Sequence, residues 1–195
     1  MSADADLAYV FWHLRQPQVA RSEYEENHFA FHRALQTNAP PGFRGARVQR
    51  LSRAPWLTGT PPAEETYEDW YYLDDSAALD RINEAAVSGT RRGPHDRVAR
   101  LAAAGVAGLY RLRHGVRAVR TRQALWFSKP ADLSYAALFE RFAARGSGEA
   151  LWMRQMTLGP TTEFCLHTDG NPPEGLSPST SLRIDAIWEF PKESP

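Results

Sequence analysis

The sequence predicts an α+β fold made of two ferredoxin-like units, the second of them degenerate. In the first half, short aromatic and β-branched runs alternate with amphipathic segments in the order β-α-β-β-α-β, the split βαβ arrangement. In the second half a similar order returns without its second helix, which indicates an internal repeat. We therefore expect two units, residues 1–115 and residues 116–195, whose two sheets face each other.

The first half opens with a strand followed by a helix. The run at Leu7–Leu14 is short, aromatic and β-branched, as expected of a buried strand. The helix predicted at Ser22–Thr37 begins with Ser22 as its N-cap, and Glu25 three residues later completes a capping box. A Pro-Pro-Gly sequence at 40–42 ends this helix.

The remaining elements of the first half are predicted from similar patterns in the sequence. Aromatic or β-branched runs predict strands, capping residues precede a helix, and a segment rich in Pro, Gly and Thr predicts a loop. In order, we expect a strand at Phe43–Leu51, a loop at Ser52–Ala63, a strand at Thr66–Leu73, a helix at Ala77–Val87, a short helix at Asp96–Ala103 and a strand at Val106–Arg113.

The second half is expected to contain four strands and one helix. Gly146 and Gly148 end the helix, and a Gly-Pro pair separates the two middle strands. The last strand alternates apolar and polar residues cleanly. In order, we expect a strand at Gln123–Lys129, a helix at Leu133–Arg145, strands at Leu151–Leu158 and Thr162–His167, a loop at Asp169–Thr180 in place of a second helix, and a strand at Leu182–Phe190.

Composition excludes several classes of protein. The 195 residues carry 23 Lys+Arg and 23 Asp+Glu, so there is no surplus positive charge to bind nucleic acid. A hydrophobic fraction of 43% and an aromatic fraction of 11% exclude a disordered chain. The charges interleave along the elements, which favours a small-molecule ligand in a pocket over a macromolecular partner.

The same features predict a cytoplasmic protein without a membrane partner. The first residues are acidic where a signal peptide needs basic ones, and no apolar stretch follows them. Nowhere does a run of about 18 apolar residues occur, so we expect no membrane-spanning helix. Cys165 is the only cysteine, which excludes an internal disulfide and favours a reducing compartment.

The first half also resembles the EthD-like members of the dimeric α+β barrel superfamily. That family carries on its first helix an aromatic residue, a second aromatic, a histidine and then x-Pro-Leu. Tyr24, His32 and Leu35 fit this pattern, whereas Asn27 and Ala34 depart from it. The segment YYLDDSAALDRIN is similar to the family's third strand and second helix, so the resemblance covers roughly residues 7–113.

The resemblance implies a fold and a kind of activity. The fold would be an eight-stranded pseudo-dimeric α+β barrel with an internal pocket, closed within one chain or, if a sheet surface stays open, completed by a homodimer. The activity would be that of an enzyme without a tightly bound cofactor, acting on an aromatic or polyketide-like compound as a monooxygenase, cyclase, isomerase or lyase. His32 or His28 would transfer a proton on a carbon acid, and Tyr24 or an arginine would polarise the adjacent carbonyl.

His28 and His32 are the sharpest candidates for chemistry. A spacing of four places both imidazoles on one helix face, and an ordinary pKa of about 6.5 suits acid–base catalysis. The same spacing holds zinc in HExxH enzymes, but Phe29 stands where that motif has its glutamate. We therefore name no metal ligand, although a metal could recruit His13 or His167 as a third ligand. In the structural alternative, one imidazole packs under the helix and the other faces solvent.

The candidate pocket residues come from three strands. His13 either faces the interior of the barrel or lies beneath a helix as a core histidine. Trp70 and Tyr72 either line a pocket for flat apolar ligands or belong to ordinary core packing. Arg183 and Asp185 share the polar face of the last strand, which either holds a substrate oxygen or faces solvent.

Two other functions remain open from the sequence. Related barrels bind heme through a histidine, and here the ligand could be His32, His114 or His167. The chain could instead be a non-catalytic binding or stress-linked module, with its pocket filled by its own aromatic side chains. Fold alone does not decide between these functions.

Overall fold

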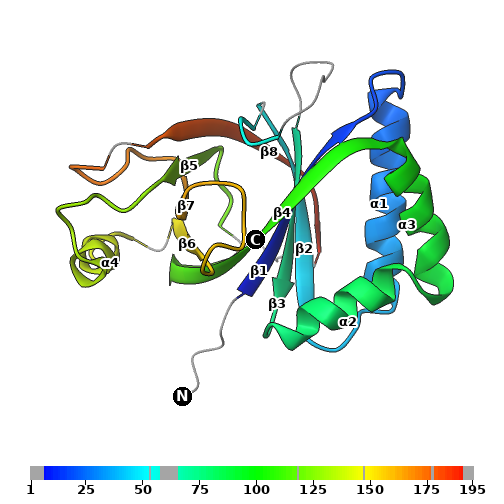
Figure 1. The fold of residues 1–195 in the computed structure, drawn as a ribbon, viewed down its shortest axis with the longest axis horizontal. Helices are drawn as coiled ribbons and strands as arrows, with labels where there is room; N and C mark the ends of the chain where they lie inside the picture. The colour runs from blue at the N-terminus through cyan, green and yellow to red at the C-terminus, as the bar shows by residue number, and fades with distance from the viewer. Residues whose placement is uncertain are drawn as a thin grey trace.

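The computed structural model describes residues 7–52, 54–57, 66–117, 119–146, 148–176 and 178–190. Across these residues, eight antiparallel strands form one closed barrel and four helices lie outside it (Figure 1). In chain order the elements are β1 (Leu7–Arg15), α1 (Arg21–Thr37), β2 (Phe43–Leu51), β3 (Thr66–Leu73), α2 (Ala77–Ala86), α3 (Gly89–Leu101), β4 (Ala102–Gly115), β5 (Gln123–Phe127), α4 (Tyr135–Ala143), β6 (Ala150–Arg154), β7 (Phe164–Thr168) and β8 (Thr180–Phe190). Around the barrel the strands follow the order β1-β3-β2-β8-β5-β7-β6-β4.

The predicted fold class is wrong. The chain does not form two ferredoxin-like units facing each other as a pseudo-dimeric α+β barrel, because all the described strands belong to one closed antiparallel β-barrel. The two halves of the chain join within the sheet, since β2 pairs with β8 and β4 pairs with β6. Over the described residues the second half carries a single helix, α4, of nine residues. Closure gives each strand a partner on both sides and removes the sheet edges.

The strands lie close to where the sequence predicts them, and the differences fall at element ends. The helix expected at Asp96–Ala103 is longer and spans Gly89–Leu101, so that β4 follows it directly. The strand expected to reach Leu158 stops at Arg154, because the chain turns at Met156 with a φ of 53°. Within the predicted loop Ser52–Ala63, residue 53 and residues 58–63 lie outside the described residues.

Large aromatic side chains pack the lumen of the barrel. Alternation along β1 points Val10, Trp12 and Leu14 inward. The indole rings of Trp12 and Trp126 lie 5.5 Å apart at 67°, an edge-to-face contact. The lumen cluster also contains Trp70, Tyr72, Tyr110, Trp152 and Cys165, all buried. The internal pocket implied by the family resemblance is therefore occupied by tryptophans over much of the lumen.

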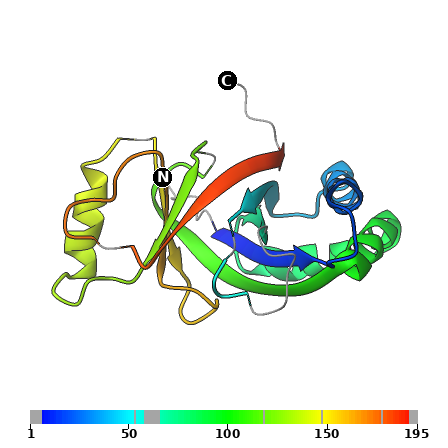
Figure 2. The ribbon, with the colours of Figure 1, turned by 90° about the horizontal axis from the view of Figure 1, so that it is seen from above.

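Three helices cover the outer face of one part of the barrel. Figure 2 shows α1, α2 and α3 together at one end of the molecule, with α4 at the opposite end. Residues on the outer faces of β1, β3 and β4 pack against these helices as a second core, which includes Leu7, Phe31, Leu35, Tyr71, Val98 and Leu109. The side chains of β1 that point away from the lumen, among them His13, therefore lie under a helical layer.

Within the described residues, no helix is long and apolar enough to cross a membrane.

Candidate functional site

A cavity of about 680 Å³ lies between this helical layer and the outer face of the sheet. Aromatic and aliphatic side chains make up much of its wall, among them Tyr9, Phe11 and Phe31. The polar groups on the wall include Tyr24, His13, His28, Asp69, Tyr71, Asp80, Asn83 and His95. The described residues that line it include no lysine and no arginine.

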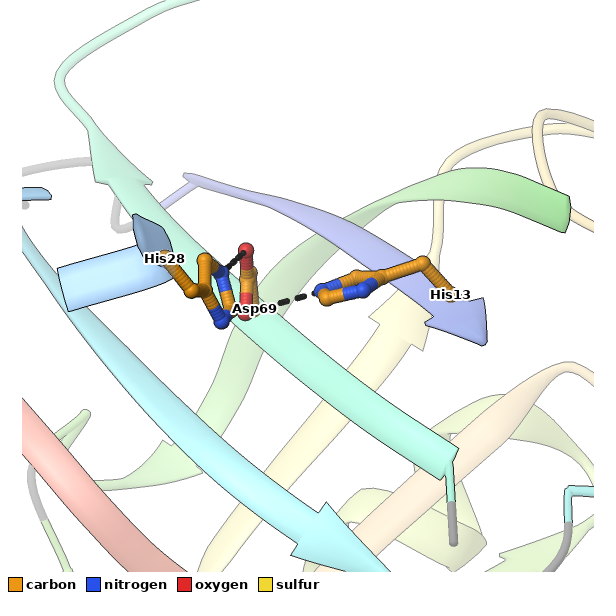
Figure 3. A group of neighbouring side chains, drawn as sticks. All are labelled: His13, His28 and Asp69. Carbon is orange, nitrogen blue, oxygen red and sulfur yellow. Dashed lines mark hydrogen bonds and ion pairs between the residues drawn. The ribbon is translucent and has the colours of Figure 1, made fainter. Parts of the chain in front are cut away.

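Asp69 is the centre of the polar group on this wall. Its Oδ2 lies 2.8 Å from His28 Nε2 and 3.3 Å from His32 Nε2, and its Oδ1 lies 3.4 Å from His13 Nε2. The Nε2 atoms of His28 and His32 are 3.1 Å apart. Figure 3 shows His13 and His28 reaching Asp69 from opposite sides, one from β1 and the other from α1. All four side chains are at most 2% exposed.

Local structure explains how these residues meet. The spacing of four residues places His28 and His32 on the buried face of α1, which also carries Tyr24. Both imidazoles are buried, so the expectation that one of them faces solvent does not hold. Asp69 faces Phe11 in the β1–β3 register, and His13 is two residues further along β1 on the same outer face. His13 therefore takes the position beneath a helix, and it lines the cavity as well.

The cluster holds one negative charge among largely neutral rings. Burial lowers the pKa of His13 and of His32, although Asp69 partly opposes this, so both rings are neutral near pH 7. Burial alone would raise the pKa of Asp69, but the adjacent His28 and His13 outweigh it and hold that pKa well below its ordinary value. Asp69 is thus an ionised carboxylate in a buried environment.

Tyrosine hydroxyls orient the cluster. Tyr24 Oη lies 2.6 Å from His13 Nδ1, and burial, followed by the nearby Asp69, raises the Tyr24 pKa. The phenol therefore stays protonated and can donate to His13 Nδ1, which turns His13 Nε2 toward Asp69. Tyr71 Oη donates to Asp69 Oδ2 at 3.0 Å. The hydroxyl of Tyr24 is thus hydrogen-bonded to His13. The family resemblance had implied a different role, in which this hydroxyl polarises a carbonyl of the substrate.

The other predicted site residues lie away from this cavity. His32 is behind the wall, where its ring stacks on Tyr71 at 5.3 Å and packs 4.8 Å from Trp188. Trp70 and Tyr72 point into the lumen; Trp70 donates to Glu68, and Tyr72 donates to the carbonyl of Arg117.

The polar face of the last strand points to solvent. Arg183 and Asp185 are both exposed, and Asp185 pairs with Arg50 at 2.9 Å. Neither residue lines the cavity. Of the histidines considered for heme, His114 is half-buried on β4 and His167 is buried among the lumen side chains, 4.8 Å from the Trp70 ring.

Asp69 is the member of this cluster that the sequence pattern did not single out. Its signal was the pair Glu68-Asp69 in the middle of an aromatic strand, where alternation must place one carboxylate on each face of the sheet. Gly105 was missed as well. It lines the cavity next to the ring of Phe11, and a Cβ at that position would lie 2.5 Å from Phe11 Cζ.

Comparison with known proteins gives no indication of function, so the proposal below is based on the geometry of the site. No family model matches the chain, and a search of curated proteins finds no similar sequence.

Proposed function

We propose that the chain is an enzyme that acts on a small, uncharged apolar or aromatic compound without a tightly bound cofactor, and that His28 with Asp69 transfers the proton. The observation that carries the proposal is the buried His28–Asp69 pair, 2.8 Å apart, on the wall of a cavity of about 680 Å³. A cavity of this volume is in the range of small-molecule sites. An acid–base pair on its wall can reach a bound substrate.

The pairing with Asp69 fixes which nitrogen of His28 is the base. The ionised carboxylate accepts a hydrogen bond from the Nε2–H group, so the proton of neutral His28 is on Nε2 and the free lone pair is on Nδ1. Among the described residues, His28 Nδ1 has no hydrogen-bond partner. In the proposed step a carbon–hydrogen bond of the substrate breaks, the proton goes to Nδ1, and the electron pair stays on the substrate, delocalised into a neighbouring carbonyl.

The charges on the wall favour an uncharged substrate. Two carboxylates, Asp69 and Asp80, border the cavity, and no lysine or arginine stands among the described residues of its wall. An anionic substrate would meet repulsion with no cation to offset it. The rings of Tyr9, Phe11 and Phe31 favour a flat apolar compound.

Deuterium exchange tests the proposal directly. A panel of uncharged aromatic ketones and 1,3-diketones, each matched with a carboxylated analogue, would be incubated with the protein in D₂O and followed by NMR. We expect the wild-type chain to exchange the acidic C–H of at least one uncharged compound and to leave its carboxylated analogue unchanged. The variants H28Q and D69N should lower the exchange rate by about 10²–10⁴-fold.

The control removes a histidine elsewhere. H114A changes a half-buried ring on β4 that does not line the cavity, and it should keep the wild-type exchange rate. Circular dichroism would verify that each variant is folded. Full exchange by folded H28Q, or no exchange of any compound by the wild type, would overturn the proposal.

A further inference from the structure

The side chains of Asp69 and the three histidines around it also place ligand-type atoms at metal-site spacing. His13, His28 and Asp69 offer ligand atoms that all lie within 4.8 Å of one another. The shorter separations are 2.8 Å from His28 Nε2 to Asp69 Oδ2, 3.1 Å between the Nε2 atoms of His28 and His32, and 3.3 Å from His32 Nε2 to Asp69 Oδ2. Ligands held at about 2.0–2.1 Å from a tetrahedral ion stand about 3.3 Å apart.

Hydrogen bonds within this cluster do not satisfy all of its polar atoms. Two Nε2 atoms face each other at 3.1 Å while both also face one carboxylate oxygen, Asp69 Oδ2. The buried atoms His13 Nε2 and Asp69 Oδ1 face each other at 3.4 Å, which is longer than a normal hydrogen bond, and among the described residues neither atom has another hydrogen-bond partner. Buried polar atoms are rarely left without a partner, because this costs about 1–3 kcal/mol for each group. A cation between these atoms would engage all of them at once.

Neighbouring tyrosines hold two of the candidate ligands, His13 and Asp69, in place. Ligand histidines in proteins usually have their second nitrogen fixed by a neighbour, and Tyr24 lies 2.6 Å from His13 Nδ1. The hydroxyl of Tyr71 holds Asp69 Oδ2 at 3.0 Å. The groups come from β1, α1 and β3, so packed elements fix their positions. His13, His28 and Asp69 also line the cavity, which leaves one side of the site open to a bound molecule.

We propose that His13, His28, His32 and Asp69 form a binding site for one divalent first-row transition metal ion, with Zn²⁺ as the ion that fits best. Three imidazole nitrogens with one carboxylate suit zinc and its neighbours, and they disfavour calcium and magnesium, which take oxygen ligands. The inference rests on the proposed function and adds regulation to it. Coordination through Nε2 keeps the remaining imidazole proton on Nδ1, so the metal-bound form of His28 has no lone pair for proton transfer.

Metal binding is measured without reference to activity. Protein stripped with a chelator would be titrated with Co²⁺, whose visible absorption reports its ligands, and metal analysis after dialysis against Zn²⁺ would give the stoichiometry. We expect one equivalent per chain and a higher melting temperature with Zn²⁺. Affinity should fall by about 10-fold or more in each of H13Q, H28Q and D69N, and it should be unchanged in H114A.

If a variant does not fold, the Zn²⁺ stoichiometry and the melting temperature of the wild-type protein still test the proposal. Absence of bound Zn²⁺ and of a shift in melting temperature, or binding that persists in folded H28Q and D69N, would overturn the metal site.

Exchange measurements separate this inference from the proposed function. Exchange by metal-free protein that Zn²⁺ suppresses supports both. Exchange with no metal binding removes the metal site and leaves the proton-transfer proposal standing. Exchange that occurs only with metal supports the site and removes proton transfer by metal-free His28.

Discussion

Two adjacent carboxylates on β3 serve opposite faces of one sheet. Glu68 points into the lumen, where it accepts hydrogen bonds of 2.7 Å from the indole N–H groups of Trp12 and Trp70. Asp69 points outward into the histidine cluster. Alternation in the sequence predicts that the two acids face different sides. It does not predict that both are buried, because that depends on the helices and strands that later cover each face.

Replacing Glu68 tests the arrangement in the lumen. Burial raises the pKa of Glu68 to about 7, against the opposing effect of the two indoles. Glu68→Gln keeps the shape but exchanges one acceptor oxygen for a donor, which leaves one indole N–H without a partner. We expect the free energy of unfolding in urea to fall by about 1–3 kcal/mol. The exposed replacement Glu84→Gln on α2 should change it by less than about 0.5 kcal/mol; equal effects of the two would contradict this arrangement.

His167 should make stability depend on pH. Burial lowers the pKa of its ring to about 3, with Arg47 adding to the effect. The unfolded ring has the ordinary value of about 6.5, so neutral His167 contributes stability above pH 6.5, and this contribution is lost as pH falls from 6.5 toward 3. The expected slope for this one group is at most about 1.4 kcal/mol per pH unit.

The comparison variant for this prediction is His167→Asn, which does not titrate. Unfolding free energies of both proteins would be measured from pH 7 to pH 4. The difference between the two curves should shift steadily with pH, and parallel curves would refute the prediction.

Among the elements, β1 and β4 together shape the cavity through one glycine. Gly105 pairs with His13, and its missing side chain leaves room for the ring of Phe11, which lines the cavity. Gly105→Ala should displace that ring, and we expect binding of a cavity ligand to weaken by about tenfold in calorimetry, or about 1.4 kcal/mol. Gly146→Ala, where a Cβ meets nothing within 4 Å, is the matched control. An unchanged dissociation constant in the Gly105 variant would show that the ring does not border the ligand.

The sequence predicts the elements well where the signal is local. Short aromatic runs such as LAYVFWHL specify strands, and the four-residue spacing of His28 and His32 specifies their shared buried face. The ends of elements are less predictable. β6 ends at Arg154 because the chain turns at Met156 with a positive φ, and the sequence has no glycine at that position to indicate the turn. The pairing of β2 with β8 joins segments far apart in the chain, and no local pattern encodes it.

The candidate site was predictable only in part for a similar reason. Tyr24, His28 and His32 share one helix and were found by spacing. Their partner Asp69 comes from a strand that meets α1 only through tertiary packing. Trp70 and Tyr72 were candidates for a pocket or for core packing, because aromatic strands suit either and periodicity does not distinguish the two; the structure places both in the core.

At the scale of the whole molecule, the barrel depends on two seams between the halves of the chain, β2–β8 and β4–β6. Gly115 closes the second seam. It pairs with Ala150 at a φ of +83°, and a Cβ there would lie 1.7 Å from the carbonyl oxygen of Glu149. Gly115→Ala should therefore lower the free energy of unfolding by at least about 2 kcal/mol, measured in urea.

A glycine in a helix provides the control. Gly93 on α3 has only Arg97 Nη1 near its would-be Cβ, at 3.5 Å, but it precedes Pro94, which opposes the usual gain of a helical Gly→Ala change, so Gly93→Ala should change the free energy of unfolding by less than about 1 kcal/mol. Destabilisation of similar size in both variants would argue against a special role for the β4–β6 seam.

The tryptophan-packed lumen gives the molecule a built-in optical reporter. Five of the six tryptophans lie in or against the lumen cluster, and Trp188 alone lies outside it, 4.8 Å from His32. Indoles in edge-to-face contact couple their electronic transitions, so the near-ultraviolet dichroism of the chain records whether the barrel is closed. The fluorescence lost on replacing Trp188 by Phe is the emission of Trp188, whose ring packs against His32 in the histidine cluster. The dichroism of the wild-type chain can thus report the integrity of the barrel, and the difference in emission between the wild type and Trp188→Phe can report changes at the histidine cluster.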